Sequence, residues 1–239
     1  MRALLFDLYD TLVWADWVAL RAGRDQLAVR AGAEAAAMRE QWVVTHDRRM
    51  RGLNRGLEGD LEAMLTACGV ACTPDLLREL ATAEFGNWAG GVRLYDDVLP
   101  ELRRFREAAY RLGIVSNASC EAGTVVRALG LDCAVDAVVL SCDVGALKPE
   151  PEILEAALER LQVGPSDALF VDDVPANLDA AATLGLATAL MARPAHDSHS
   201  PGGAPELVRT ADVARPRGCA VDGTGHPRVT RLSEVWQLL

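Results

Sequence analysis

The chain of 239 residues has a mass of 25.6 kDa, with half of its residues hydrophobic and 24% charged, which is the balance of a compact soluble protein. Its formal net charge of −10 would repel a phosphate backbone or an anionic membrane surface, so we expect neither nucleic acid nor a membrane as partner. No run reaches the roughly 18 apolar residues of a membrane span, and an acid interrupts the apolar start MRALLFDLYDTL, which predicts a cytoplasmic protein. Six scattered cysteines without a CxxC pair predict neither a disulfide framework nor a zinc site.

Short apolar runs alternate with helical periods along much of the chain. Such continuous apolarity is typical of parallel strands that helices cover on both faces. The predicted strands are Ala3–Phe6, Leu112–Val115, Ala137–Leu140, Ala168–Val171 and Ala187–Met191. Apolar residues spaced by three and four predict helices between them, over 99–109, 122–129 and 154–161. The alternation predicts an α/β fold with a doubly wound parallel sheet.

The stretch from Val13 to Gly91 departs from this alternation and is predicted to contain helices only. Thr73 and Pro74 have the residue types favoured at an N-cap and at the first helical position. We interpret residues 13–91 as an inserted helical cap, with residues 1–12 and 92–239 forming the core. The tryptophans of this region either pack in its core, which is the commoner role, or line a substrate pocket. They are Trp14, Trp17, Trp42 and Trp88.

A second irregular stretch, rich in Gly, Pro, Ser and His, runs from about Pro194 to Pro227 and is predicted to be a surface loop. Its His and Cys residues match no standard spacing of metal ligands, so we expect no metal site there. These residues are His196, His199, Cys219 and His226.

Polar side chains directly follow four of the predicted strands. In an open parallel sheet, ligands bind at the carboxyl ends of the strands, so these residues are candidates for a functional site. They are Asp7, Tyr9, Asp10 and Thr11, then Ser116, Asn117, Ala118 and Ser119, then Ser141 and Lys148, and finally Asp172 and Asp173. Each alone could serve as a cap or turn residue, but their agreement at four strands predicts a site at this edge.

Lys148 precedes Pro149, which is predicted to begin a helix, so its ammonium would face the positive end of a helix dipole. An anion should compensate this charge, either Asp7 and Asp173 or an anionic group of the substrate. The substrate group would be shared with the Ser116 hydroxyl and the amides of the turn 117–119.

Three carboxylates, from Asp7, Asp172 and Asp173, are predicted to converge at the same edge. Like charges packed so closely take up a proton or bind a cation, and oxygen-only ligands suit Mg²⁺. Asn177 lies four residues beyond Asp173, where it could add a ligand or orient Asp173.

Four segments, in this order and after comparable strands, resemble the signature motifs of the haloacid dehalogenase-like (HAD) hydrolases. They are FDLYDTL, IVSNAS, the run from Gly145 to Pro151, and FVDDVPANLDAA. The resemblance covers most of residues 1–12 and 92–193 and the last dozen residues. It implies a Rossmann-like core with a helical cap inserted after the first strand, and a hydrolase that acts on a small-molecule substrate.

The resemblance also implies roles for individual residues. Asp7 would be the nucleophile that forms a covalent aspartyl intermediate, and Ser116 and Lys148 would hold the oxygens of the transferred group. Asp173 would be the principal Mg²⁺ ligand with Asp172 beside it. The other implied roles are a metal contact by the Tyr9 backbone carbonyl and fixation of the nucleophile loop by Thr11. Thr11 and Asn117 are, with Ser116 and Lys148, the candidate substrate-binding residues.

Two motifs favour different reactions. Phosphatases of the superfamily usually carry a second Asp as general acid/base where this chain has Tyr9, and Tyr at this position resembles the 2-haloacid dehalogenases. Asp10 occupies the next position of the turn and is not expected to substitute. Asp172 and Asp173, in contrast, resemble the metal-dependent members.

We therefore expect Mg²⁺-dependent hydrolysis of a small phosphate monoester through a phosphoaspartyl intermediate. One alternative is a 2-haloacid dehalogenase, for which Arg39 of the cap is a candidate to grip the substrate carboxylate. The other is a catalytically impaired, HAD-like binding protein. Neither the substrate nor the oligomeric state is indicated by the sequence.

Overall fold

The computed structural model describes residues 1–193 and 225–239, and these residues contain a six-stranded sheet that is parallel throughout. The strands stand in the order β5-β4-β1-β6-β7-β8. They are β1 (Ala3–Phe6), β4 (Arg111–Ser116), β5 (Ala137–Leu140), β6 (Ala168–Asp172), β7 (Ala187–Met191) and β8 (Arg228–Val229). The five predicted strands are confirmed, and β8 is an additional one. Because the strand order reverses at β1, the crevice for ligands is expected outside its carboxyl end.

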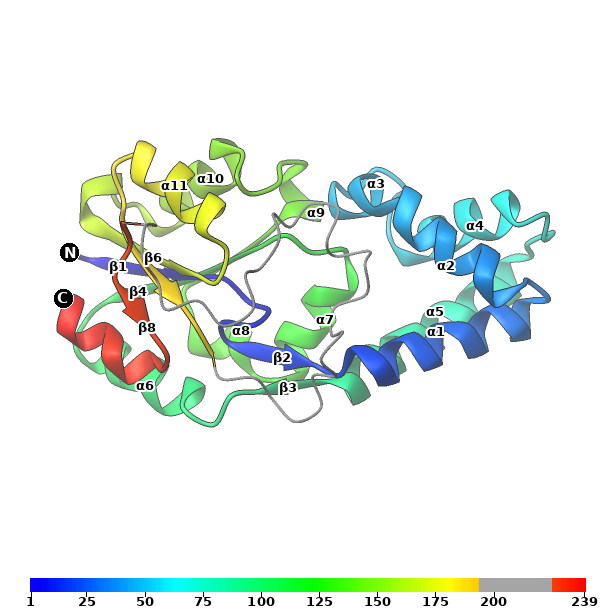
Figure 1. The fold of residues 1–239 in the computed structure, drawn as a ribbon, viewed down its shortest axis with the longest axis horizontal. Coiled ribbons are helices and arrows are strands. Elements are labelled where there is room, and N and C mark those ends of the chain that lie inside the picture. Colours follow the sequence, from blue (N-terminus) through cyan, green and yellow to red (C-terminus); the bar gives the residue numbers. More distant parts are fainter. Residues whose placement is uncertain (194–224) are drawn as a thin grey trace.

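Helices cover both faces of this sheet (Figure 1). Those of the core are α6 (Val98–Glu107), α7 (Glu121–Ala128), α8 (Leu131–Ala134), α9 (Ser141–Val144), α10 (Pro151–Leu161) and α11 (Pro175–Thr183), with short 3-10 helices η1 (Pro165–Asp167) and η2 (Leu232–Leu238). Leu4 and Phe6 of β1 pack in one cluster with α6 and α7, whereas Ala3 and Leu5 pack in another with α10 and α11. Because side chains alternate along a strand, burial of both faces explains why β1 is apolar throughout. The predicted doubly wound α/β fold is confirmed.

A separate layer of helices lies beside the sheet (Figure 1) and is called the cap below. It consists of α1 (Trp17–Ala31), α2 (Ala35–Val44), α3 (His46–Met50), α4 (Leu57–Ala67) and α5 (Pro74–Gly91). Leu27, Trp42, Leu61 and Leu80 contribute to its own apolar cluster. The predicted start of α5 is confirmed, because Pro74 is its first residue and the Thr73 hydroxyl accepts a hydrogen bond from the backbone N–H of Leu76 at 3.2 Å.

The prediction that residues 13–91 contain helices only was wrong at its beginning. Residues Val13–Ala15 form β2, which pairs antiparallel with β3 (Val92–Leu94). In this strand one half-buried residue lies between two buried ones. Three residues are too few to show the alternation of a strand in the sequence. These two strands lead the chain into and out of the cap, and the division into core and cap at residue 13 stays a prediction.

Part of the predicted loop at 194–227 falls within the described residues. His226 packs against the core, with Nδ1 at 2.7 Å from the Thr188 hydroxyl and Nε2 at 3.0 Å from Asp179 Oδ1. His196, His199 and Cys219 lie outside the described residues.

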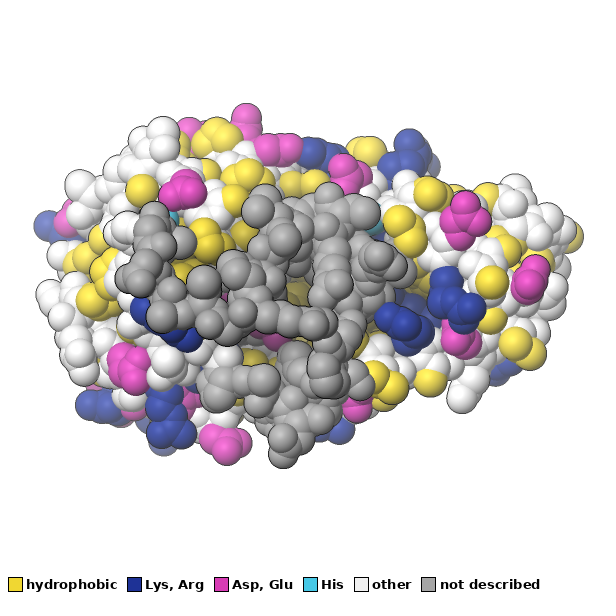
Figure 2. Space-filling view, viewed as in Figure 1, with side chains coloured by type: hydrophobic (Ala, Val, Ile, Leu, Met, Phe, Trp, Pro, Cys, Tyr) yellow, Lys and Arg dark blue, Asp and Glu magenta, His cyan; other side chains and the backbone are white. Residues whose placement is uncertain are grey.

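Figure 2 shows acidic and basic side chains interspersed over the face in view. Within the part of the chain that the structure describes, no helix has both the length and the apolarity needed to span a bilayer.

Candidate active site

The loop after β1 places Asp7 at the carboxyl edge of the sheet. Its backbone N–H donates to the carbonyl of Val171 at 2.9 Å, which continues the pairing of β1 with β6. The chain then turns sharply, with Asp10 in the left-handed region at φ 58° and the N–H of Val13 returning to the carbonyl of Leu8 at 2.9 Å. The Asp7 side chain is therefore held by a short, hydrogen-bonded turn and is buried.

The ammonium of Lys148 lies between two carboxylates. Its Nζ is 2.5 Å from Asp7 Oδ1 and 2.7 Å from Asp172 Oδ2, and all three side chains are buried. Asp7, which was predicted for this role, and Asp172, which was not, therefore compensate the lysine charge directly. Burial raises the pKa of Asp7 above its ordinary range, although the neighbouring ammonium of Lys148 opposes this shift. Burial lowers the pKa of Lys148, but Asp172 and Asp7 outweigh it and the net shift is upward, so this ammonium keeps its proton.

Asp172 has hydrogen-bond donors on both carboxylate oxygens. In addition to Lys148, the N–H of Val174 reaches Oδ1 at 2.7 Å, and the amide of Asn177 reaches both oxygens at 3.1 Å. Asn177 lies in the first turn of α11, and its side chain returns to the end of β6 to contact Asp172. A role of Asn177 as a ligand or in orienting Asp173 stays a prediction.

The side chain of Asn117 grips the backbone of Lys148. Its Nδ2 donates to the Lys148 carbonyl at 2.8 Å, and its Oδ1 accepts from the Lys148 N–H at 2.7 Å. The helix after Lys148 begins at Pro151 and not at Pro149, and the Lys148–Pro149 peptide is cis. The prediction of a helix start at Pro149 was therefore wrong, because Pro151 also has the residue type favoured at the first helical position.

Two hydroxyl groups in this region are buried without a hydrogen-bond partner among the described residues. They belong to Ser116, at the end of β4, and Thr11, in the loop after β1. A buried hydroxyl that lacks a partner costs about 1–3 kcal/mol, which a polar ligand can recover. Ser116 is thus available to donate to an anionic group beside Asp7.

Tyr9 belongs to an aromatic cluster where the cap meets the core. Its ring centroid lies 6.3 Å from that of Trp17 and 5.7 Å from that of Trp88. Burial raises the pKa of Tyr9, and the nearby carboxylates of Glu121 and Asp7 add to this shift. The phenol therefore stays neutral and cannot act as a base near neutral pH.

Several buried charges of the cap were not predicted from the sequence. Arg24 donates to Glu84 Oε1 at 2.7 Å, and the indole N–H of Trp88 donates to the same oxygen at 3.1 Å. A signal was present, because Glu84 lies four residues before Trp88 on the buried face of α5. Arg39, in contrast, pairs with Asp25 at 2.7 Å and has a side chain 42% exposed.

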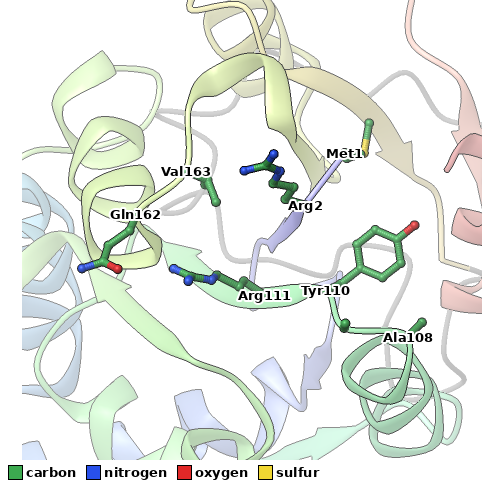
Figure 3. Close-up of a pocket in the computed structure, with 8 residues that line it drawn as sticks. Met1, Arg2, Ala108, Tyr110, Arg111, Gln162 and Val163 are labelled. Carbon is green, nitrogen blue, oxygen red and sulfur yellow. The ribbon is translucent and has the colours of Figure 1, made fainter.

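A hollow of about 300 Å³ lies at the opposite edge of the sheet, at the amino ends of β1 and β4 (Figure 3). Its lining contains no carboxylate, imidazole or thiol side chain, and its polar side chains are those of Arg2, Tyr110, Arg111 and Gln162. The lining residues are Met1, Arg2, Ala108, Ala109, Tyr110, Arg111, Gln162 and Val163.

The donor groups at the carboxyl edge suit Mg²⁺ by their chemistry. They are oxygen atoms only, and the carboxylate of Asp7 is destabilised in its ionised form by burial, which a bound cation would reverse. Among the described residues, no three His, Cys, Asp or Glu side chains are grouped as a metal site, and between Asp7 and Asp172 stands the ammonium of Lys148.

The chain belongs to the haloacid dehalogenase-like hydrolases, whose sequence profile matches residues 1–185. It is a hydrolase of this family. A glyceraldehyde 3-phosphate phosphatase of Methanopyrus kandleri is 27% identical over 176 residues, which are 72% of this chain and 76% of the relative.

Solved structures that resemble the chain include both phosphate-binding and dehalogenating enzymes. The L-2-haloacid dehalogenase PA0810 is 25% identical with a TM-score of 0.62, covering 100% of this chain and 98% of the other. A HAD family enzyme of Bacteroides thetaiotaomicron, in complex with magnesium and inorganic phosphate, is 20% identical with a TM-score of 0.65, covering 83% and 98% of the two chains. The latter shows a shared fold.

Proposed function

We propose that this hydrolase cleaves a small phosphate monoester in a Mg²⁺-dependent reaction through a phosphoaspartyl intermediate on Asp7. The observation that carries the proposal is the buried Lys148 ammonium on Asp7, with the unpartnered Ser116 hydroxyl at the end of the adjacent strand β4. A nucleophile beside two donors suited to phosphoryl oxygens is the arrangement that phosphoryl transfer requires. Residues 1–12 and 92–239 form the core of this enzyme, and residues 13–91 form its cap.

In the proposed reaction, a carboxylate oxygen of Asp7 forms a bond to phosphorus while the bond from phosphorus to the alcohol oxygen breaks. Lys148 and Ser116 hold the phosphoryl oxygens and neutralise the charge that develops on them. Water then attacks phosphorus and frees Asp7. Overall, one water molecule gives a proton to the leaving oxygen and its hydroxyl to the released phosphate. Thr11 supports the loop that carries Asp7, and the turn at Asn117 supports the segment that carries Lys148.

Asp7, Asp173 and the backbone carbonyl of Tyr9 are the proposed Mg²⁺ ligands. Asp172 stands beside them, and because both of its oxygens already accept hydrogen bonds, its proposed role is to position Lys148. When bound, Mg²⁺ supplies positive charge that stabilises ionised Asp7 and the phosphoryl oxygens.

Dehalogenation of a 2-haloacid is the second candidate, and Tyr9 is the observation in its favour. The phenol, packed on Trp17 and Trp88 with its pKa raised by burial, is a weak proton donor for the leaving alkoxide of a phosphate ester, whereas a halide leaving group needs no proton. Arg39, the cap residue considered for gripping the haloacid carboxylate, is paired with Asp25 on the surface of the cap.

A parallel assay separates the two candidates. Phosphate release from 4-nitrophenyl phosphate is measured with Mg²⁺ and with chelator, beside halide release from L-2-chloropropionate in the same buffer. The aryl leaving group needs little protonation, so we expect phosphate release that Mg²⁺ supports and chelator abolishes. Halide release that is insensitive to chelator would replace the phosphatase proposal with the dehalogenase one.

A further inference from the structure

Arg49, in α3 of the cap, is a buried cation without a carboxylate contact. It is 4% exposed, and no carboxylate of the described residues lies within 4.0 Å of its guanidinium. Its hydrogen bonds go to neutral acceptors, from Nε to the Thr45 hydroxyl at 3.2 Å and from Nη2 to the Trp42 carbonyl at 2.8 Å. Glu121, Asp60 and Glu84 act on this guanidinium only from beyond salt-bridge distance, so it has the capacity to bind an anion directly.

Trp42 adds a second unused donor beside Arg49. Its ring lies between two guanidinium groups, at 3.9 Å from Arg24 and 4.4 Å from Arg49. Arg24 is neutralised by Glu84 at 2.7 Å, whereas the indole N–H of Trp42 is buried without an acceptor among the described residues. A guanidinium without a carboxylate at salt-bridge distance and an indole N–H without an acceptor therefore stand together in this part of the cap.

Glu121 presents the complementary group from the core. It is the first residue of α7, it follows the Ser116–Cys120 segment directly, and it is 1% exposed. Among the described residues, its Oε1 has no donor and its Oε2 accepts only the weak hydrogen bond of the Cys120 thiol at 3.4 Å. A buried carboxylate oxygen without a donor can accept a hydrogen bond from a hydroxyl or ammonium group.

The structure links these groups to the proposed active site. The carboxylate of Glu121 contributes to the upward pKa shift of Tyr9 after burial, as does Asp7, so all three lie within short electrostatic range. On the cap side, the carbonyl of Met50, the residue after Arg49, accepts from the Ser141 hydroxyl at 2.7 Å. That hydroxyl also accepts from the N–H of Ala118, two residues after Ser116, at 2.9 Å. Arg49 and Glu121 thus lie where the cap contacts the loops around Asp7.

We propose that Arg49 and Glu121 recognise the leaving group of the substrate. Arg49, assisted by the indole of Trp42, binds a carboxylate, and Glu121 binds a hydroxyl or ammonium group on the same molecule. The substrate class is then the phosphate ester of a small organic acid that also carries a hydroxyl or amino group. This assignment rests on the proposed phosphatase function, since it concerns the part of the ester that leaves.

Four phosphate esters test the assignment, because they separate the two recognised groups. Glycerol 3-phosphate has the hydroxyl alone, 3-phosphooxypropanoate has the carboxylate alone, 3-phosphoglycerate has both, and O-phosphoserine has carboxylate and ammonium. kcat/KM is measured for each with the wild type, Arg49→Met, Glu121→Gln and the control Arg39→Met. Arg39 is a matched control because it is also a cap arginine, but it is paired on the cap surface.

We expect the wild type to prefer 3-phosphoglycerate over glycerol 3-phosphate and Arg49→Met to reduce this ratio about 100-fold, as for a lost charge-assisted hydrogen bond. Arg39→Met should keep the ratio within about 2-fold. Glu121→Gln should reduce the ratio of 3-phosphoglycerate or O-phosphoserine to 3-phosphooxypropanoate about 10-fold. The larger of these two reductions identifies whether hydroxyl or ammonium is the natural donor.

The assignment is overturned if the wild type has the same kcat/KM for 3-phosphoglycerate as for glycerol 3-phosphate. It is also overturned if Arg49→Met lowers kcat/KM equally for all four esters. Should Arg49→Met unfold, Arg49→Lys retains the charge and is expected to keep part of the carboxylate preference. If no ester is hydrolysed at all, the proposed function fails separately. Calorimetric binding of D-glycerate then decides the assignment: binding weakened by Arg49→Met but not by Arg39→Met supports it, and equal binding by both overturns it.

Discussion

Asn117 holds Lys148 by both polar groups of its backbone, donating to the carbonyl at 2.8 Å and accepting from the N–H at 2.7 Å. The segment after β4 is thereby tied to the loop that carries the ammonium. The side chain of Lys148 contacts Asp7 and Asp172, while the side-chain amide of Asn117 holds the backbone of the same lysine. Asn117 is therefore a positioning residue, which sequence alone had placed only in a turn that binds substrate.

Replacement of Asn117 by Ala should leave two backbone groups of Lys148 without partners. Because these groups lose their partners, we expect the free energy of unfolding to fall by about 1–3 kcal/mol. Because the Lys148 ammonium is no longer held in place, we also expect kcat to fall with little change in KM. Urea denaturation and steady-state kinetics measure the two effects. Asn117→Asp keeps the acceptor for the Lys148 N–H, so its kcat should lie between those of Ala and wild type. Unchanged kcat in Asn117→Ala would contradict the positioning role.

Replacement of Asp7 by Asn should abolish turnover while the fold persists. The amide oxygen can still accept from Lys148, but it cannot form the acyl phosphate, so kcat is expected to fall by roughly 1,000-fold or more. Phosphate release from 4-nitrophenyl phosphate provides the measurement, with circular dichroism as the check on folding. Residual activity above about a tenth of wild type would remove Asp7 from the role of nucleophile.

The ion pair of Lys148 with Asp172 should contribute far more to stability than an exposed pair. Asp172→Asn removes one charge from a fully buried contact and is expected to cost about 3 kcal/mol. Asp167→Asn is the matched control, because Asp167 pairs with Arg2 at 3.8 Å between exposed side chains and should change stability by less than about 0.5 kcal/mol. Chemical denaturation of both variants at pH 7 compares them, and equal losses would show that the buried pair gives no special stability.

The buried carboxyl group of Asp60 should make the free energy of unfolding depend on pH. Burial, with a contribution from Glu121, raises its pKa from 3.8 to about 6, against the lowering effects of Asn54 and Arg49. The folded protein thus binds this proton more tightly than the unfolded chain, so the stabilisation is present below about pH 4 and is lost as the pH rises to about 6. Asp60→Asn removes the titration. The stability of the variant relative to wild type should increase from pH 4 to pH 7 by up to about 3 kcal/mol, and a flat difference in denaturation experiments would contradict this.

The sheet and the residues at its carboxyl edge could be predicted because four of the five apolar runs end directly before a polar residue. Contacts between segments far apart in the sequence could not be predicted in this way. The spacing of residues along a helix shows which of them share a face, but it does not show which strand end that face contacts. This is why the contact of Asn177 with Asp172 was not predicted from the sequence. Arg49 and Glu121 were missed because charged residues in helices are usually solvent-exposed, and their burial depends on the cap and core packing together.

The pairing of β2 with β3 makes the helical segment interchangeable in principle. Val13 stands directly opposite Leu94, and the N–H of Asp16 donates to the carbonyl of Gly91 at 2.7 Å, so both junctions of the segment are neighbours on one ribbon. A tight turn that joins Asp16 to Gly91 would close this ribbon into a hairpin while β1 and β4 keep their register. The same two junctions would accept a helical segment from another protein, and Asp7 and Lys148 would stay in contact while that segment is exchanged.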